Sequence, residues 1–440
     1  MPRSNGAPVT AHDFVNGFRR AIDPKIKSPY GFLLKNIKNG DKILRGQEKN
    51  ISTFGIQAID DYTLEIVLER YTPYFPDLLA HHIAYPFPQK TYDDYQDAWT
   101  KPENIVCNGP YKLTQWIPHE HIKLVRNEYY WNQDSVKTPN IFYYPTENRS
   151  SELWDFFANK LDTTESIPEN QIEWIQDNLK DSLRNTTYPG IVYYGFNMTI
   201  EPFKSNLKLR QALALAIDRN FITEKIIKLN AIPAYSWVPK GIGNYKPQDA
   251  FFASMTQNER EAYAKKLFAE AGFSSADHLK LEILFNENDL AKKTSIKISE
   301  MWRNVLGVNT VLRHETWKEY LNRIEKKEFQ ILRISGVAIL PTAKDFLERF
   351  ITDSSGINNL AGYSNSEFDR LMNAGIKADS LYDQNLFFSQ AEKIFLHDLP
   401  AIPLYHPTTR HLVSPKIQGW VDNFIDVHPS RYLKIISQKK

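Results

Sequence analysis

The sequence has few cysteines, no long apolar run and little net charge, and each of these absences excludes a class of protein or site. It contains a single cysteine, Cys107, so no disulfide can form within the chain and a zinc site built on several cysteines is excluded. No apolar run reaches the roughly 18 residues that a membrane-spanning helix needs. The charges nearly cancel, at a formal net charge of +2, so the chain lacks the basic excess that marks a nucleic-acid-binding protein.

Catalytic signatures are also missing. The sequence has no glycine-rich phosphate loop, no HExxH helix and no GxSxG nucleophile turn. Its 52 acidic residues place carboxylates near one another almost everywhere, so their spacing does not indicate a glycosidase-type pair. The adjacent pair His81-His82 could suggest a metal, but no partner spacing supports it. His119 and His121 would share one face of a strand and could also suggest a metal, but we interpret them as solvated residues of a hairpin turn. We therefore expect a binding protein with no metal and no cofactor, rather than an enzyme.

Aromatic residues, by contrast, are abundant. They make up 13% of the chain, and its 23 tyrosines and 9 tryptophans exceed what apolar cores usually need. Tyrosine and tryptophan combine a large apolar area with a polar tip, which suits a ligand-binding surface. The length of 440 residues and the balance of 42% hydrophobic to 24% charged residues predict a globular protein of two or three domains.

The most informative stretch is residues 202–241, which begins PFKSNLKLRQALALAIDR. Ser205 and Asn206 can cap a helix. Its apolar positions recur at helical spacing and comprise Leu209, Ala212, Leu213, Ala216 and Ile217. Polar residues then separate it from a second helix, and two prolines bracket a loop that carries Tyr235 and Trp237. The residues alone predict a buried helix, a polar corner and a helix that leads into an aromatic loop.

The order of these pieces resembles a known family. The extracytoplasmic peptide-binding proteins of ABC importers, solute-binding protein family 5 of the oligopeptide and dipeptide type, carry PF-x-x-N-x-x-(V/L)-R-x-A-(L/I)-x-x-A-(I/L)-(D/N)-R before a proline-rich loop with an aromatic residue. The segment from Pro202 to Arg219 fits this pattern throughout. A chance match of that length is not expected.

Other segments resemble the same family. They include SPY at 28–30, NGPYKL at 108–113 in a hairpin that the alternation predicts, YYGFN at 193–197 and PAIPLY at 400–405. The resemblance runs from about residue 4 to the C-terminus. Relatives are exported and carry a longer segment ahead of the motif at Asn5-Gly6, whereas the N-terminus here shows no apolar segment of a signal peptide. We therefore expect an N-terminally shortened member.

Helices and strands alternate after residue 241. Apolar spacing predicts helices around 264–271, 298–305 and 317–324, and strands at 279–283, 308–312 and 330–335. Such alternation predicts a mostly parallel sheet with helices on its faces. The resemblance implies an α/β periplasmic-binding-protein type II fold, with two lobes, a ligand cleft between them and an extra small domain. We place the small domain, without its first strands, at 1–89, lobe I at 90–191 and 408–440, and lobe II at 192–407.

The resemblance also implies which residues meet a ligand. They are Tyr30, Tyr194, Trp317, Arg333, Gly336, Val337 and Ala338. Tyr30 and Tyr194 match tyrosines that line the cleft of the oligopeptide type, and the residues at 336–338 match an extended segment that pairs with the peptide backbone. A packed loop aromatic is the alternative for Tyr30. Trp317 lies on an apolar helix face, so core packing is its alternative.

The sequence departs from the family where a ligand's α-amino group is held. The family usually has a tryptophan near position 336 and an aspartate at 339, but this chain has Gly336 and Ile339, and the nearest acid, Asp345, falls outside the clamp. Positions that can meet a peptide's C-terminus are replaced by Ile324 and Ala291. An unpaired buried ammonium is costly, so we expect ordinary free peptides to bind weakly, or the ligand to be different.

These observations leave several functions open. We favour the substrate-binding component of an ABC importer, a periplasmic monomer that captures peptides between hinged lobes and delivers them to a membrane permease. The same fold could instead bind a modified or cell-wall peptide, haem or a metal chelate. A degenerate member without a transport role is the third hypothesis, and an enzyme is a distant fourth.

Overall fold

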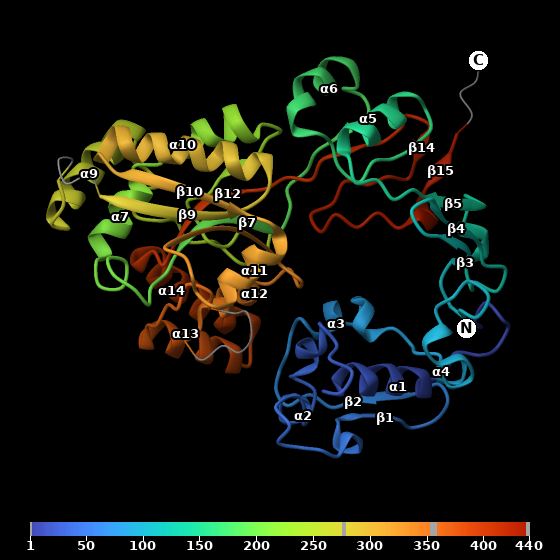
Figure 1. The fold of residues 1–440 in the computed structure, drawn as a ribbon. Helices are drawn as coiled ribbons and strands as arrows, with labels where there is room; N and C mark the ends of the chain where they lie inside the picture. Colours follow the sequence, from blue (N-terminus) through green and yellow to red (C-terminus); the bar gives the residue numbers. More distant parts are fainter. Residues whose placement is uncertain (1, 275–278, 353–358, 437–440) are drawn as a thin grey trace. The chain divides into compact units, whose positions relative to one another are not determined.

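The structure is a computed structural model that describes residues 2–274, 279–352 and 359–436, and the chain divides into two compact units (Figure 1). The first unit comprises Met1–Thr164, Leu412–Val421 and Val427–Lys440, and the second comprises Glu165–His411 and Asp422–Asp426. Residues 165–191, which we placed in lobe I, group with the second unit. The separate small domain at 1–89 stays a prediction. None of the described helices combines the length and the apolar character that a membrane crossing needs.

The first unit is built from short elements. Its first helix begins at Ala11, after a capping box in which the Asp13 carboxylate accepts the backbone N–H of Thr10 at 2.8 Å. The predicted hairpin is present as two antiparallel strands, to which a third is added on one side. The elements are α1 (Ala11–Ile22), α2 (Gly40–Leu44), β1 (Ile56–Ala58), β2 (Leu64–Ile66), α3 (Phe75–Leu78), α4 (Gln89–Tyr95), β3 (Tyr111–Ile117), β4 (His121–Arg126), β5 (Asn140–Tyr143), α5 (Arg149–Phe157), β14 (Ile417–Gln418) and β15 (Lys434–Ile435).

The second unit is organised around a six-stranded sheet with the order β10-β9-β11-β7-β12-β8. The prediction of a mostly parallel sheet was wrong for half of it. Strands β10, β9 and β11 are parallel, but β7 is antiparallel to both β11 and β12. The reason is connectivity: β7 and β12 come from the extended segments at 190–196 and 401–406, outside the alternating stretch from which we inferred parallel strands. The strands of this sheet are β7 (Gly190–Phe196), β8 (Ile232–Pro233), β9 (Lys280–Asn286), β10 (Asn309–Glu315), β11 (Ile331–Val337) and β12 (Ala401–His406), and the short strands β6 (Leu183–Arg184) and β13 (His411–Leu412) lie outside it.

Helices cover both faces of this sheet (Figure 1). The predicted apolar face of α7 is fully buried in the main core, and Trp302 of α10 donates its indole N–H to the carbonyl of Leu213 on α7 at 2.9 Å. Leu284 and Leu332 point to the opposite face, where they form a smaller core with Tyr320 of α11. The helices are α6 (Ile172–Asn178), α7 (Leu207–Leu215), α8 (Arg219–Phe221), α9 (Gln257–Glu270), α10 (Asp289–Leu306), α11 (Trp317–Glu325), α12 (Ala343–Leu347), α13 (Ser366–Lys377) and α14 (Leu381–Asp398).

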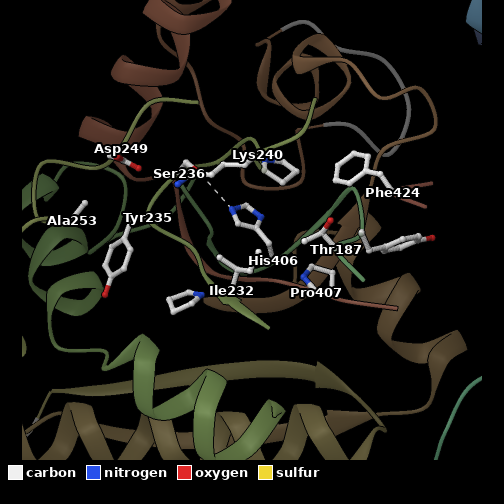
Figure 2. Close-up of a pocket in the computed structure, with 13 residues that line it drawn as sticks. Thr187, Ile232, Tyr235, Ser236, Lys240, Asp249, Ala253, His406, Pro407 and Phe424 are labelled. Atoms are coloured by element: carbon white, nitrogen blue, oxygen red, sulfur yellow. Dashed lines mark hydrogen bonds between the residues drawn. The ribbon is translucent and has the colours of Figure 1, made fainter. Parts of the chain in front are cut away.

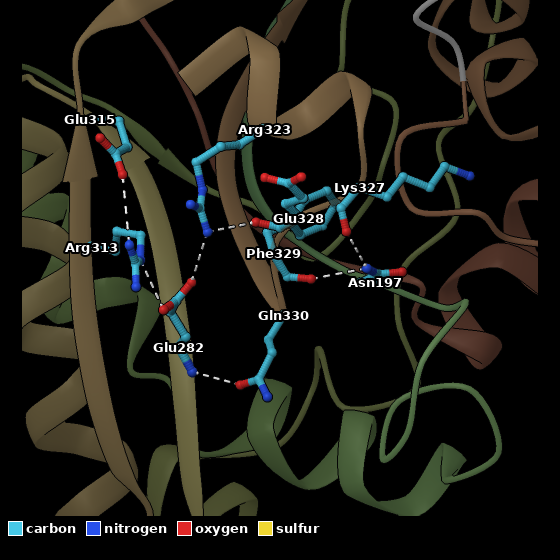
Figure 3. Close-up of polar contacts among 9 residues, drawn as sticks. All are labelled: Asn197, Glu282, Arg313, Glu315, Arg323, Lys327, Glu328, Phe329 and Gln330. Atoms are coloured by element: carbon cyan, nitrogen blue, oxygen red, sulfur yellow. Dashed lines mark hydrogen bonds and ion pairs between the residues drawn. The ribbon is translucent and has the colours of Figure 1, made fainter. Parts of the chain in front are cut away.

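A polar network fixes the start of β11 (Figure 3). Glu282 of β9 pairs with Arg313 of β10 at 2.9 Å and with Arg323 of α11 at 3.7 Å. The Gln330 side chain accepts the backbone N–H of Glu282 at 2.8 Å, and Asn197 Nδ2 donates to the carbonyls of residues 327 and 329 at 3.0 and 2.9 Å. The turn that leads into β11 is therefore held by contacts with both β9 and Asn197, which fixes where β11 begins beside β9.

Candidate functional site

The most distinctive feature of the second unit is an open edge on β11. The strand pairs with β7 along its whole length, from Ile331 to Val337, but it pairs with β9 only at Ile331 and Leu332. Within the described ranges, no strand continues the pairing on that side from residue 333 onward. An inner strand of the sheet thus presents an edge at its C-terminal half, and an exposed edge is a template for pairing with another extended chain.

The hydrogen bonds show which backbone groups of β11 point outward. The carbonyl of Arg333 accepts the Tyr320 hydroxyl at 2.6 Å, and that of Val337 accepts Arg349 Nη2 at 2.8 Å, so both face away from β7. Ala338 N–H, by contrast, donates to Pro189, on the β7 side, at 2.9 Å. Because orientation alternates along a strand, Ser335 directs both its N–H and its C=O outward, and its side chain is exposed. The outward N–H of Val337 lies next to them.

Trp317 stands beside this edge at the first position of α11. Thr316 caps the helix, and Trp317 stacks on Tyr320 with ring centroids 5.6 Å apart and 26° between the planes. Because the Tyr320 hydroxyl donates to the carbonyl of Arg333, the stacked rings of Trp317 and Tyr320 are held next to the start of the open edge. Trp317 is 61% exposed, so the structure gives it no core-packing role and leaves its ring available to a ligand.

Arg333 is a buried cation with unused hydrogen-bonding capacity. It is only 9% exposed, and its Nε has no hydrogen-bond partner in the described part of the chain. No carboxylate of the described residues forms an ion pair with it. Its cross-strand neighbour is Tyr194, which is fully buried and shares a hydrogen bond with Ser295 at 2.8 Å. Burial raises the pKa of the Tyr194 hydroxyl. Tyr194 thus packs beneath Arg333, and a direct ligand contact through Tyr194 stays a prediction.

The C-terminal end of the edge carries a second arginine. Arg349 places Nη1 2.7 Å from where a side chain at Gly336 would begin, so the guanidinium occupies the space that any larger residue at 336 would need. Its Nη2 lies 3.5 Å from the carboxylate of Asp345. That carboxylate also accepts the backbone N–H of Ile339 at 2.9 Å. Of the predicted residues, those at 333 and 336–338 therefore share one strand with its extension, and Trp317 is linked to them through Tyr320.

Tyr30 belongs to the first unit. Its ring contacts the rings of His81 and His82, each with centroids 5.0 Å away, and the two histidine rings are 4.0 Å apart. Burial, followed by the neighbouring His82, lowers the pKa of His81. Tyr30 is partly exposed. Its predicted contact with a ligand stays a prediction.

A cavity of about 280 Å³ lies at the opposite margin of the same sheet, near β8 and β12 (Figure 2). Its lining includes Ser236, Lys240, Asp249, His406 and Phe424. The volume is just below the range of about 300–1,000 Å³ that is usual for small-molecule sites, so it fits one side chain rather than a whole peptide. His406 donates from Nδ1 to the carbonyl of Gly190 at 3.0 Å, and Gly190 pairs with Val337. The cavity and the open edge are thus linked through β7.

His406 predicts how stability depends on pH. Burial lowers the pKa of its imidazole from 6.5 to about 4. The unfolded chain binds this proton more tightly than the folded chain does. The contribution of His406 to the free energy of unfolding is therefore complete above pH 6.5, and about 3 kcal/mol of it is lost as the pH falls from 6.5 to 4. We expect His406→Gln, which cannot titrate, to flatten the profile of the free energy of unfolding between pH 4 and 6.5. Urea unfolding of both proteins at each pH measures it, and parallel profiles would contradict the assignment.

The comparison with the His406→Gln variant is needed because a second buried group, Glu392, changes the free energy of unfolding with pH in the opposite direction. Burial raises the pKa of Glu392 from 4.5 to about 7, so its contribution to stability falls as the pH rises over the same range. The difference between the wild-type and His406→Gln profiles isolates the histidine, whereas the wild-type profile alone does not.

Several residues of this site were not predicted from the sequence. Ser335 and Arg349 carry the outward groups and the second cation, yet neither stands at a position that the family pattern marks, and 12 residues of chain separate Val337 from the arginine that binds it. Tyr320 falls within the helix predicted around 317–324, but the sequence assigned it no role at a site. The sequence at 334–337 contained no signal for Ser335, because the direction of its backbone N–H and C=O depends on how β11 pairs with β7. No local pattern could have indicated Arg349 or His406.

Known proteins resemble this chain over nearly its whole length. It is 33% identical over 420 residues to the periplasmic oligopeptide-binding protein OppA of Salmonella typhimurium, which covers 95% of this chain and 77% of the relative. The structure of the Escherichia coli murein tripeptide binding protein MppA matches with a TM-score of 0.85 at 29% identity, covering 99% of this chain and 85% of that one. Haemophilus influenzae OppA in complex with RPPGFSPFR matches with a TM-score of 0.82 at 31% identity, covering 99% and 86%.

These matches confirm the α/β two-lobe fold and the periplasmic location that the sequence predicted. A family model described as bacterial extracellular solute-binding proteins, family 5 Middle, matches residues 4–358. Members of that family are binding components of transporters and not enzymes. This chain therefore belongs to the bacterial extracellular solute-binding proteins of family 5.

Proposed function

We propose that this protein is the substrate-binding component of an ABC importer and captures extended peptides through main-chain pairing at the open edge of β11. The single observation that carries the proposal is the outward set of backbone groups at Ser335 and Val337. A peptide that adds a strand there gains hydrogen bonds that do not depend on its side chains. The similarity to oligopeptide- and murein peptide-binding proteins supports the same ligand class.

The other features give this edge a ligand-binding character. Trp317 offers an exposed aromatic surface at one end, against which a peptide side chain can pack. Arg333 supplies a cation to a carboxylate of the ligand, and burial strengthens such a bond. The 280 Å³ cavity near His406 has room for one side chain. The cleft between lobes, the delivery to a membrane permease and the monomeric state are part of the proposal.

Isothermal titration against a library of di- to pentapeptides tests this function. We expect a subset of peptides to bind with a stoichiometry of one per chain. Each should raise the free energy of unfolding by about 2.7 kcal/mol at a ligand concentration 100 times Kd. Free amino acids and sugars serve as negative controls. If the protein is folded by circular dichroism and neither the library nor its N-blocked counterparts release or absorb heat, the peptide proposal is wrong.

A further inference from the structure

Two arginines flank the open edge. Arg333 lies at its start and Arg349 lies against Gly336 near its end, about three residues or 10 Å further along an extended strand. An extended peptide binds with an ammonium group at one end and a carboxylate at the other, so a site for such a peptide should offer one anion and one cation. This edge offers two cations.

The acidic side chains beside Arg349 are already engaged within the protein, Asp345 with Arg349 at 3.5 Å and Glu348 with Lys344 at 2.9 Å. Asp345 is buried, and its Oδ2 accepts the N–H of Ile339 and faces Arg349. Burial, the largest influence, raises the pKa of Asp345, with Arg349 acting against it. The carboxylate therefore turns inward to hold the turn after β11. A ligand group at the edge meets Arg349 instead, whose Nη1 makes no hydrogen bond within the described residues and whose side chain is 30% exposed.

The surface around this end is apolar. Val337 and Ile339 are 39% and 36% exposed, and neither can accept a hydrogen bond from an ammonium through its side chain. A free α-ammonium at this end would lose water, find Asp345 and Glu348 already paired with cations, and lie close to the Arg349 guanidinium. Each of these effects disfavours it.

Resting on the proposed function, we infer that the ligand is a dianionic peptide-like chain without a free α-ammonium, one acidic group of which is bound by Arg333 and the other by Arg349. A peptide whose amino end carries an acidic acyl group meets this requirement. So does one whose blocked end is followed by an acidic side chain. Their shared chemistry is two carboxylates separated by about 10 Å of extended chain.

Three forms of one tripeptide separate this inference from the function on which it rests. They are the free zwitterion, the N-acetyl form with one carboxylate and the N-succinyl form with two. We expect the N-succinyl form to bind at least tenfold more tightly than the N-acetyl form, and the zwitterion to bind most weakly. An equal or higher affinity for the zwitterion would overturn the inference and leave peptide binding intact. If none of the three forms binds to the folded protein, the result would count against peptide binding itself.

Arg349→Met provides the matching variant, because methionine keeps an extended apolar side chain and removes the charge. We expect it to lower the affinity for the N-succinyl form about tenfold, to the level of the N-acetyl form, and to leave the affinity for the zwitterion unchanged or higher. Arg370→Met removes one positive charge from the exposed face of α13 and controls for net charge. An unchanged preference for the N-succinyl form in Arg349→Met, with thermal unfolding as in the wild type, would exclude Arg349 as the second anion site. The comparison of the three ligand forms on the wild type does not depend on how the variant folds.

Discussion

Glu392→Ala is expected to lower the free energy of unfolding by about 4 kcal/mol, the largest stability loss that we predict for one polar residue. Glu392 of α14 is fully buried, and its two carboxylate oxygens accept four hydrogen bonds. The donors are the backbone N–H groups of Trp237, Val238 and Gln248, at 2.8–2.9 Å, and the Tyr245 hydroxyl at 2.6 Å. Alanine leaves these donors without an acceptor inside the core, and each unsatisfied donor costs about 1–3 kcal/mol before water or relaxation offsets it.

The consequence reaches the aromatic loop that the sequence analysis singled out. Trp237 is buried against Phe350 and Phe395, and its indole N–H donates to the carbonyl of Phe346 at 3.0 Å. The loop that carries it also supplies Ser236 and Lys240 to the cavity. Urea unfolding of Glu392→Ala measures the loss, and Glu392→Gln, which keeps one acceptor oxygen, should lose about half as much. Glu367→Ala, at an exposed ion pair on α13, is the control and should change stability little, because solvent screens the pair. A loss at Glu392 as small as the control's would contradict the account of the loop.

Ser335→Pro is expected to weaken peptide binding about 100-fold while the fold is retained. Proline removes the outward N–H of Ser335, and its ring occupies the space where an added strand would lie. Two lost or distorted main-chain hydrogen bonds, at about 1–1.5 kcal/mol each, account for that factor. Stability should change little, because the N–H of Ser335 faces away from β7 and contributes nothing to the pairing of β11 with β7.

Two variants control for this result. Ser335→Ala removes only the exposed hydroxyl, so we expect binding within about threefold of the wild type. Val192→Pro, at the residue paired with Ser335 on the inner strand β7, should instead disrupt the sheet and unfold the protein. Calorimetric affinities similar to the wild type for a folded Ser335→Pro would mean that the ligand does not use this edge.

The sequence predicted the parts of the fold that depend on local periodicity. The apolar residues of α7 and the alternation through β9, α10, β10 and α11 were identified from spacing alone. The structure contains these elements in the expected order and buries the apolar face of α7. The antiparallel position of β7 was not predictable in this way, because the direction of pairing is decided by segments far apart in the chain. The boundary at Thr164 and Glu165 depends on tertiary contacts in the same manner.

The candidate site was predicted in part for a similar reason. The family pattern located residues 333 and 336–338, and it drew attention to the replaced positions Gly336 and Ile339. It could not show that Arg349 lies against Gly336 or that Asp345 turns inward to Ile339, because both depend on how α12 and the turn after it pack against β11. Trp317 illustrates the limit of periodicity. Its spacing fits an apolar helix face, yet it lies beyond the end of the small core that Tyr320 and Ile324 form.

Hydrogen–deuterium exchange of the β11 amides, with and without a saturating peptide ligand, tests the central claim most directly. If a ligand adds a strand to the open edge, the amides of Ser335 and Val337 should exchange at least tenfold more slowly in the complex. Those of residues 334 and 336, which already face β7, should change little. Unchanged exchange at 335 and 337, in a complex that calorimetry shows to be saturated, would contradict main-chain pairing at this edge.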